Sequence, residues 1–226
     1  MKSASDSQKS QLVTLAPALR LAILSLMAVV ILSGGFLPGC GFSRPYPAIR
    51  SFALKPPDTN LNPAKARNPL LVQVTSGGAA PQYETRKLVY KIGQNEFTED
   101  FYNELVGMPS RLAADLLASY LENYASRFRA TLGVSSQSPD ISLDIYLLAL
   151  HGDYSLSPPR ATAELKVTVS YQRGSRARTI LSKTYIGHQE LPANAPDRPS
   201  ALVTGLGQAL ATVMAEIASD MAVAVH

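Results

Sequence analysis

Residues 161–171, Ala161-Thr-Ala-Glu-Leu-Lys-Val-Thr-Val-Ser-Tyr171, alternate apolar and polar side chains along their whole length. Because successive side chains of a strand point to opposite faces of a sheet, this pattern predicts a strand with one buried face and one wet face. The stretch before it, Ile141-Ser-Leu-Asp-Ile-Tyr-Leu-Leu-Ala-Leu150, begins with the same alternation and then becomes fully apolar. Residues 179–186 form a third strand-like segment beyond a turn at residues 173–177, so we expect three neighbouring strands in one sheet.

Shorter strand-like segments lie upstream. They cover residues 49–54, 70–74, 86–92 and 95–101. The Ser76-Gly77-Gly78 sequence predicts a turn that ends the second of them. Gly93 joins the last two, which predicts a hairpin.

Two segments have the apolar spacing of helices that face a core. The first opens at Pro109, which suits the first helical position, and its apolar residues recur every four positions as far as Phe128, with Gly133 as the predicted stop. The second carries an apolar stripe from Leu202 to Met221. Each helix has one apolar face, so the sequence predicts an α+β fold: a two-layer sandwich with two long helices packed on one face of a mixed, mostly antiparallel sheet.

The N-terminal region has the pattern of an export signal. Basic residues precede the apolar run Leu21-Ala-Ile-Leu-Ser-Leu-Met-Ala-Val-Val-Ile-Leu32, and small residues follow it. A spanning helix needs about 20 apolar residues, and this run is shorter. A cleaved signal peptide is therefore the favoured interpretation, and an uncleaved membrane anchor is the alternative.

The tetrapeptide Leu37-Pro38-Gly39-Cys40 resembles the lipobox of bacterial lipoproteins. This resemblance implies a diacylglyceryl group on the Cys40 thiol, with an N-acyl chain on the new N-terminus, as the only non-protein group. Several acyl chains hold a protein on a membrane durably. Cys40 is the only cysteine, so no intrachain disulfide can form.

We therefore divide the chain into a signal peptide at residues 1–39, a lipidated tether at 40–47 and a single domain at 48–226. Removal of residues 1–39 takes away three basic residues and one acidic residue, which lowers the formal net charge from +4 to +2. The mature chain is nearly neutral and has no basic stripe interleaved with aromatic residues, so we expect no nucleic-acid partner. Gly41 is not the aspartate of an inner-membrane retention signal, which favours the periplasmic face of the outer membrane over the inner membrane.

The sequence offers no recognisable reaction centre. It lacks a phosphate loop that ends in Gly-Lys-Ser/Thr and a Gly-x-Ser-x-Gly elbow. His151, His188 and His226 lack companion ligands at metal-site spacing. We expect no catalytic residue, no metal and no enzyme activity.

Aromatic residues gather around the predicted hairpin at residues 86–101. Some of these rings are expected to pack in the core, whereas exposed rings would be anchors for a protein partner. We predict partner binding by Tyr90, Lys91, Phe97 and Tyr102. Acidic residues between them are interpreted as a solvated face rather than as a glycosidase-like carboxylate pair.

The order of these elements resembles the ABC-type transport auxiliary lipoproteins, which include the lipoprotein of the paraquat-inducible intermembrane transport system. The segments that carry the resemblance are Phe52-Ala-Leu54, Leu88-Val-Tyr-Lys91, Asn95-Glu-Phe97 with Tyr102, the helix start at Pro109, residues 163–169 and residues 209–217.

This resemblance implies a non-catalytic subunit of a transport system for lipids or hydrophobic solutes. Its implied partners are a periplasmic protein with mammalian-cell-entry (MCE) domains and the permease and ATPase of an ABC transporter, and relatives also suggest a homo-oligomeric ring. The alternative function is an outer-membrane lipoprotein that regulates or assembles another envelope complex, for example as an activator of a peptidoglycan synthase.

Overall fold

The computed structural model describes residues 47–55, 66–133, 138–173 and 176–225. The predicted signal peptide and nearly all of the predicted tether, including Cys40, lie outside the described residues. Their assignment therefore stays a prediction.

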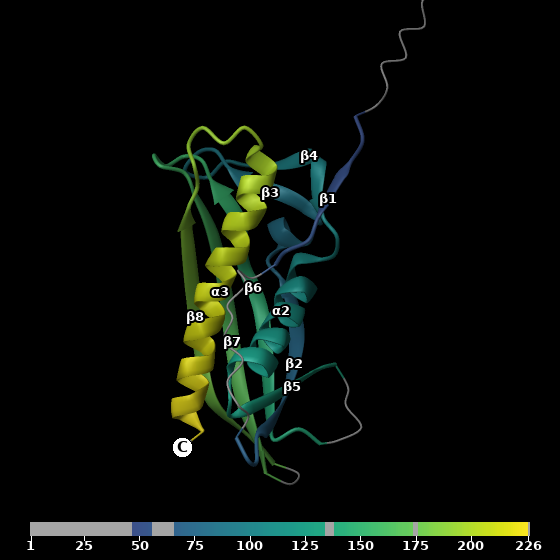
Figure 1. Cartoon of the computed structure of the whole chain (residues 1–226), viewed down its shortest axis with the longest axis vertical. Helices are drawn as coiled ribbons and strands as arrows, with labels where there is room; N and C mark the ends of the chain where they lie inside the picture. Colours follow the sequence, from purple (N-terminus) through teal and green to yellow (C-terminus); the bar gives the residue numbers. More distant parts are fainter. Residues whose placement is uncertain (1–46, 56–65, 134–137, 174–175, 226) are drawn as a thin grey trace, which may run out of the picture. The chain divides into compact units, whose positions relative to one another are not determined.

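The long strands form an antiparallel meander. Strand β6 (Ile141–Asp153) pairs with β7 (Arg160–Arg173), and β7 pairs with β8 (Arg176–Glu190). The side chains of Leu165, Val167 and Val169 in β7 are fully buried, whereas Lys166 between them is exposed. The predicted alternation therefore places one face of the meander in the core. The C-terminal helix, yellow in Figure 1, lies over the meander.

The other edge of β6 is shared by two strands. Strand β2 (Leu70–Ala79) runs parallel to its N-terminal half, and β3 (Lys87–Lys91) runs parallel to its last residues, Gly152 and Asp153. Outside β2 lies β5 (Phe128–Leu132), and outside β3 lie β4 (Phe97–Leu105) and then β1 (Arg50–Phe52). The result is a mixed sheet of eight strands in the described residues.

Both helices cover the same face of this sheet. Helix α2 (Pro109–Tyr124) packs on β2, β5 and β6, and α3 (Arg198–Ala224) packs on β6, β7 and β8 (Figure 1). A Cβ atom at Gly187 would lie 2.1 Å from the carbonyl oxygen of Ala209, so only glycine lets α3 approach β8 this closely. The predicted α+β sandwich with two helices on one face is confirmed.

Helix α3 is the one helix in the described part of the chain that is long and apolar enough to span a membrane. Its apolar stripe from Leu202 to Met221 lies in the core. Packing against the sheet accounts for its composition, as the helical spacing in the sequence predicts.

The predicted end of the first helix is wrong. The chain leaves α2 at Ala125, whose backbone is extended, and Phe128 begins strand β5 instead of continuing the helix. Phe128 is 1% exposed, so it is a core residue. Its position matches the four-residue spacing of the helix, but its side chain reaches the core from strand β5. The most buried stripe of α2 runs through Leu117 and Leu121, and the predicted positions Leu112, Leu116 and Tyr120 are half-buried beside it.

The predicted turn at Ser76-Gly77-Gly78 is also wrong. Strand β2 continues through these residues to Ala79, with a register shift against β6 between Ser76 and Ala79. Gly78 adopts a positive φ of 102°, which glycine tolerates at a bulge. The two glycines therefore bend the strand without ending it. A short 3-10 helix, η1 (Pro81–Tyr83), follows.

Candidate partner-binding surface on the β3–β4 hairpin

The predicted binding residues lie on one hairpin at the edge of the sheet. Tyr90 and Lys91 end β3, Phe97 begins β4, and Tyr102 lies further along β4. The structure therefore brings all four to one region. It divides them by exposure, because Phe97 is 42% exposed and Tyr102 40% exposed, whereas Tyr90 and Lys91 are half-buried.

Tyr90 is held by contacts within the domain. Its hydroxyl donates a hydrogen bond to Oδ2 of Asp100 at 2.8 Å, and its ring lies 5.6 Å from that of Tyr154. Burial and the neighbouring Asp100 carboxylate raise the pKa of Tyr90 above its usual value, so the phenol remains a neutral donor. Tyr90 and Tyr154 line a pocket of about 350 Å³ together with Ile92 and Arg198.

Asp100 organises the middle of β4. Besides the Tyr90 hydroxyl, its carboxylate accepts bonds from the backbone amides of Tyr102 and Asn103 and from the Asn103 side chain, at 2.9 to 3.0 Å. Burial alone would raise the pKa of Asp100, but these hydrogen bonds lower it below its usual value. The carboxylate is therefore ionised at neutral pH and fixes the local backbone.

The backbone that Asp100 fixes is a bulge. Lys87 pairs with Glu104 and Val89 with Glu99, so two steps along β3 correspond to five steps along β4. The extra residues of β4 include Phe101 and Tyr102, whose rings meet at 5.2 Å between centroids. The interpretation of Asp100 as part of a solvated acidic face missed this role. Aspartate side chains often bond backbone amides two or three residues ahead and interrupt regular strands. An aspartate inside a predicted strand is therefore the signal that could have indicated the bulge.

Lys91 is also bound internally. Its Nζ lies 3.1 Å from Oδ2 of Asp153, which is only 4% exposed. Burial opposes ionisation of Asp153, but hydrogen bonds from Ser155 and Lys91 lower its pKa below the usual value. The Lys91 charge therefore neutralises a buried carboxylate.

Phe97 covers a small cluster on the sheet face away from the helices. A Cβ atom at Gly152 would meet Leu202 of α3, so the neighbouring His151 points to the opposite face. The Phe97 ring meets the His151 ring edge-on, with 5.4 Å between the ring centroids. The Tyr83 ring stacks on His151, with 5.9 Å between the centroids.

This cluster is neutral at physiological pH. The Tyr83 hydroxyl lies 2.8 Å from Nδ1 of His151, which burial holds in the unprotonated form by lowering its pKa to about 4. Burial likewise raises the pKa of Tyr83 to about 12. Tyr83 therefore donates to His151, and the pair supports the ring of Phe97 from below.

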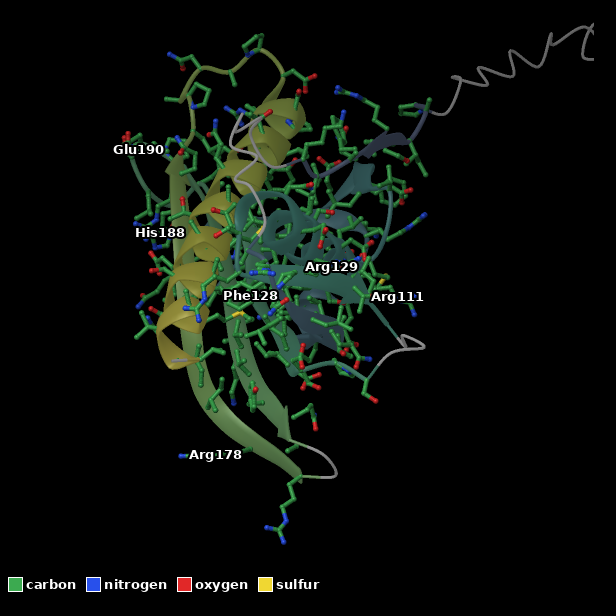
Figure 2. The ribbon with its side chains drawn as sticks, turned by 60° about the horizontal axis from the view of Figure 1, so that its bottom comes forward. Arg111, Phe128, Arg129, Arg178, His188 and Glu190 are labelled. Atoms are coloured by element: carbon green, nitrogen blue, oxygen red, sulfur yellow. The ribbon has the colours of Figure 1, made fainter. Side chains whose placement is uncertain are left out.

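Other polar residues of the sheet lie away from the hairpin. Figure 2 shows His188 and Glu190 on β8, and Arg178 projecting into solvent at the far end of the β7–β8 hairpin. Among the described residues, no group of three or more His, Cys, Asp or Glu side chains could hold a metal ion.

Comparison with known proteins identifies the fold but no family. The chain matches no protein-family model by sequence, and no curated protein matches it. A Xanthomonas campestris protein of the DUF330 family superimposes with a TM-score of 0.58 at 16% identity, over 78% of this chain and 94% of that one. A second structure, of an uncharacterised protein, gives 0.58 at 13% identity, over 77% and 99%. A lipoprotein of Neisseria meningitidis gives 0.33 at 12% identity, over 68% and 99%.

Proposed function

We propose that this chain is a non-catalytic lipoprotein, anchored by Cys40 at the periplasmic face of the outer membrane, that serves as a subunit of an MCE-type ABC transport system for lipids or hydrophobic solutes. The lipobox-like sequence Leu37-Pro38-Gly39-Cys40 and the order of elements in the domain support the class. The fold shared with a DUF330 protein is compatible with it.

The observation that carries the proposal is the contrast between paired polar groups and exposed rings on one hairpin. Asp153 is bound by Lys91, and His151 by Tyr83, so these buried groups stabilise the domain. Phe97 is supported by this cluster and still leaves 42% of its surface in solvent. A rigid, exposed aromatic ring loses little conformational entropy on binding, which suits a protein-docking anchor.

We narrow the proposed contact set by the internal contacts of its members. Tyr90 and Lys91 position the hairpin through Asp100 and Asp153, and Phe97 is the ring that we assign to the MCE-domain partner. Substitution of Tyr90 or Lys91 would disturb the hairpin as well as the contact. Phe97 is therefore the cleaner position for a test.

Crosslinked pull-down from native membranes tests this assignment. We expect F97S to lose most of the co-purified MCE-domain protein, because it removes the anchor and keeps both the Tyr83–His151 hydrogen bond and the Lys91–Asp153 ion pair. The matched control is L132S, since Leu132 is 47% exposed at the end of β5, away from both the hairpin and β8. Equal recovery of the partner by both variants would contradict the assignment, and recovery of a peptidoglycan synthase instead would favour the alternative function.

We also propose that copies of the chain associate edge to edge in a ring. Strand β8 pairs only with β7 in the described residues, which leaves the outer edge of a 15-residue strand without a backbone partner there. A long open edge favours pairing with another strand. In a ring, β8 of one copy meets a different surface of the next. A photo-reactive amino acid placed on β8 of the full chain would therefore give crosslinked oligomers if copies meet there, and only monomers if they do not.

A further inference from the structure

Exposed apolar side chains gather where the chain enters the domain. Ile49 is 62% exposed, Phe101 60%, Tyr102 40% and Val106 51%. We call these four residues the apolar edge. They come from β1, β4 and their flanking residues, which form the outermost strands on this side of the sheet.

The strand register brings the apolar edge together. Arg50 pairs with Asn103 in parallel register, so Ile49 lies beside Tyr102. The Val106 amide donates to the carbonyl oxygen of Phe52, which places Val106 at the other end of the same short strand pair. Phe101 touches Tyr102 ring to ring. Ile49, Phe101 and Tyr102 therefore lie together, and Val106 lies at the far end of the same strand pair, beyond the hydrogen-bonded Ser51 and Glu104. The Asp100 hydrogen bonds fix the backbone at Tyr102.

The cations around the apolar edge are paired. Arg50 pairs with Asp197 at 2.6 Å, Arg86 with Glu104 at 2.9 Å and Lys87 with Glu99 at 3.0 Å. No cation of these three pairs is left over for an anionic headgroup. Any attraction of this surface to a bilayer must therefore come from apolar burial.

The chain that leads into the apolar edge is short. Only residues 41–48 separate Cys40 from Ile49. An extended chain spans about 3.5 Å per residue, so Ile49 stays within about 30 Å of the Cys40 backbone. A lipid on Cys40 would thus hold the apolar edge close to the membrane surface, at a high effective concentration.

From these observations we infer that the apolar edge of Ile49, Phe101, Tyr102 and Val106 docks into the interfacial layer of the lipid bilayer that holds Cys40. This inference rests on the proposed lipidation of Cys40. Tyrosine rings prefer the boundary between headgroups and acyl chains, where the ring is buried and the hydroxyl stays wet. The contact orients the domain and leaves Phe97, five residues before Tyr102 at the start of β4, free for a protein partner.

A single tryptophan reports on this contact, because the natural chain has none. The full-length lipidated variant Y102W is reconstituted into vesicles of phosphatidylethanolamine and phosphatidylglycerol that contain brominated acyl chains. We expect its emission to shift to shorter wavelength and to lose most of its intensity, and we expect both effects to persist at high salt. The matched control, L132W at the end of β5, keeps the emission of an exposed indole, since Leu132 is 47% exposed.

The outcomes separate this inference from the proposed function. Flotation of the vesicles and the mass of the Cys40 peptide report lipidation independently of the tryptophan. A lipidated protein that floats while Y102W stays unquenched overturns the docking inference and leaves the proposed function intact. A different outcome is a Y102W emission that shifts to shorter wavelength only in membranes that hold the MCE-domain protein, and not in pure vesicles. That result assigns the apolar edge to a protein partner and also overturns the docking inference. Absence of lipid on Cys40 contradicts both proposals.

Discussion

The β6–β8 meander with α3 and the β1–β4–β3 edge use aromatic and apolar residues in different ways. In the meander, strict alternation gives complete burial, with Leu165 and Val167 at 0% exposure against the helix. At the edge, strands are short, the register is broken, and large rings such as Phe101 remain in solvent. Apolar burial fixes the first region. The second combines buried apolar residues of β3 and β4 with polar bonds around Asp100 and between Lys91 and Asp153 of β6. The meander therefore holds the domain together, and the edge presents a surface.

Truncation of a core residue in the meander should have the largest effect on stability. L165A removes a fully buried side chain between β6, β8 and α3, and we expect a loss of about 3 kcal/mol in the free energy of unfolding. Urea denaturation of the full chain measures it, with I186A on the exposed face of β8 as the control, for which we expect a change within about 0.5 kcal/mol. Similar losses for both variants would mean that burial does not distinguish the two faces of the meander.

Acidification should act on the cluster beneath Phe97. His151 has a pKa of about 4 in the folded domain and 6.5 as its reference value, so the unfolded chain binds more protons between these values. Stability from the neutral His151 is complete above pH 6.5 and falls as pH drops toward 4, by about 2 kcal/mol after allowance for solvent screening.

Denaturation at a series of pH values checks this dependence. The variant H151Q keeps an acceptor near Tyr83 but cannot titrate, so its stability should fall less than that of the wild type from pH 6.5 to 5. The slope that remains belongs to His188, whose pKa burial also lowers. A wild-type curve with the same slope as that of H151Q would show that His151 is not the titrating group. The carboxylates with lowered pKa, such as Asp100 and Asp153, lose their contributions only at lower pH.

Removal of the Asp100 charge should have a smaller effect on stability, confined to the edge. D100N weakens the bonds from the Tyr90 hydroxyl and the Tyr102 and Asn103 amides, and we expect a loss of about 1 kcal/mol because the site is partly solvated. Amide hydrogen exchange should rise in residues 98–105 and stay unchanged in β7. Unchanged exchange in β4 would mean that the bulge does not depend on Asp100.

The sequence predicted the regions in which one local pattern dominates. The alternation of β7 and the apolar stripe of α3 are long, so tertiary contacts reinforce the pattern that the residues already set. The predictions that proved wrong concern segments in which two patterns overlap. Phe128 fits the helical spacing but is buried from β5, and the glycines at 77 and 78 bend β2 without ending it.

The hairpin was located from its aromatic residues, but the roles of its members depend on contacts far along the chain. Lys91 meets Asp153, and Phe97 meets His151, and neither distant partner can be read from local spacing. Nor does local spacing show that β2 and β3 share one edge of β6. Pairings of this kind are fixed by the packing of the whole domain.

The central claim is that a lipid on Cys40 holds this domain at the membrane, where the domain functions by binding through its surface and not by catalysis. Mass spectrometry of the N-terminal peptide of the mature chain, isolated from membranes, tests it most directly. The account predicts that the peptide begins at Cys40 and carries the mass of a thioether-linked diacylglyceryl group and an N-acyl chain. A chain that retains residues 1–39 with an unmodified Cys40 thiol would contradict it.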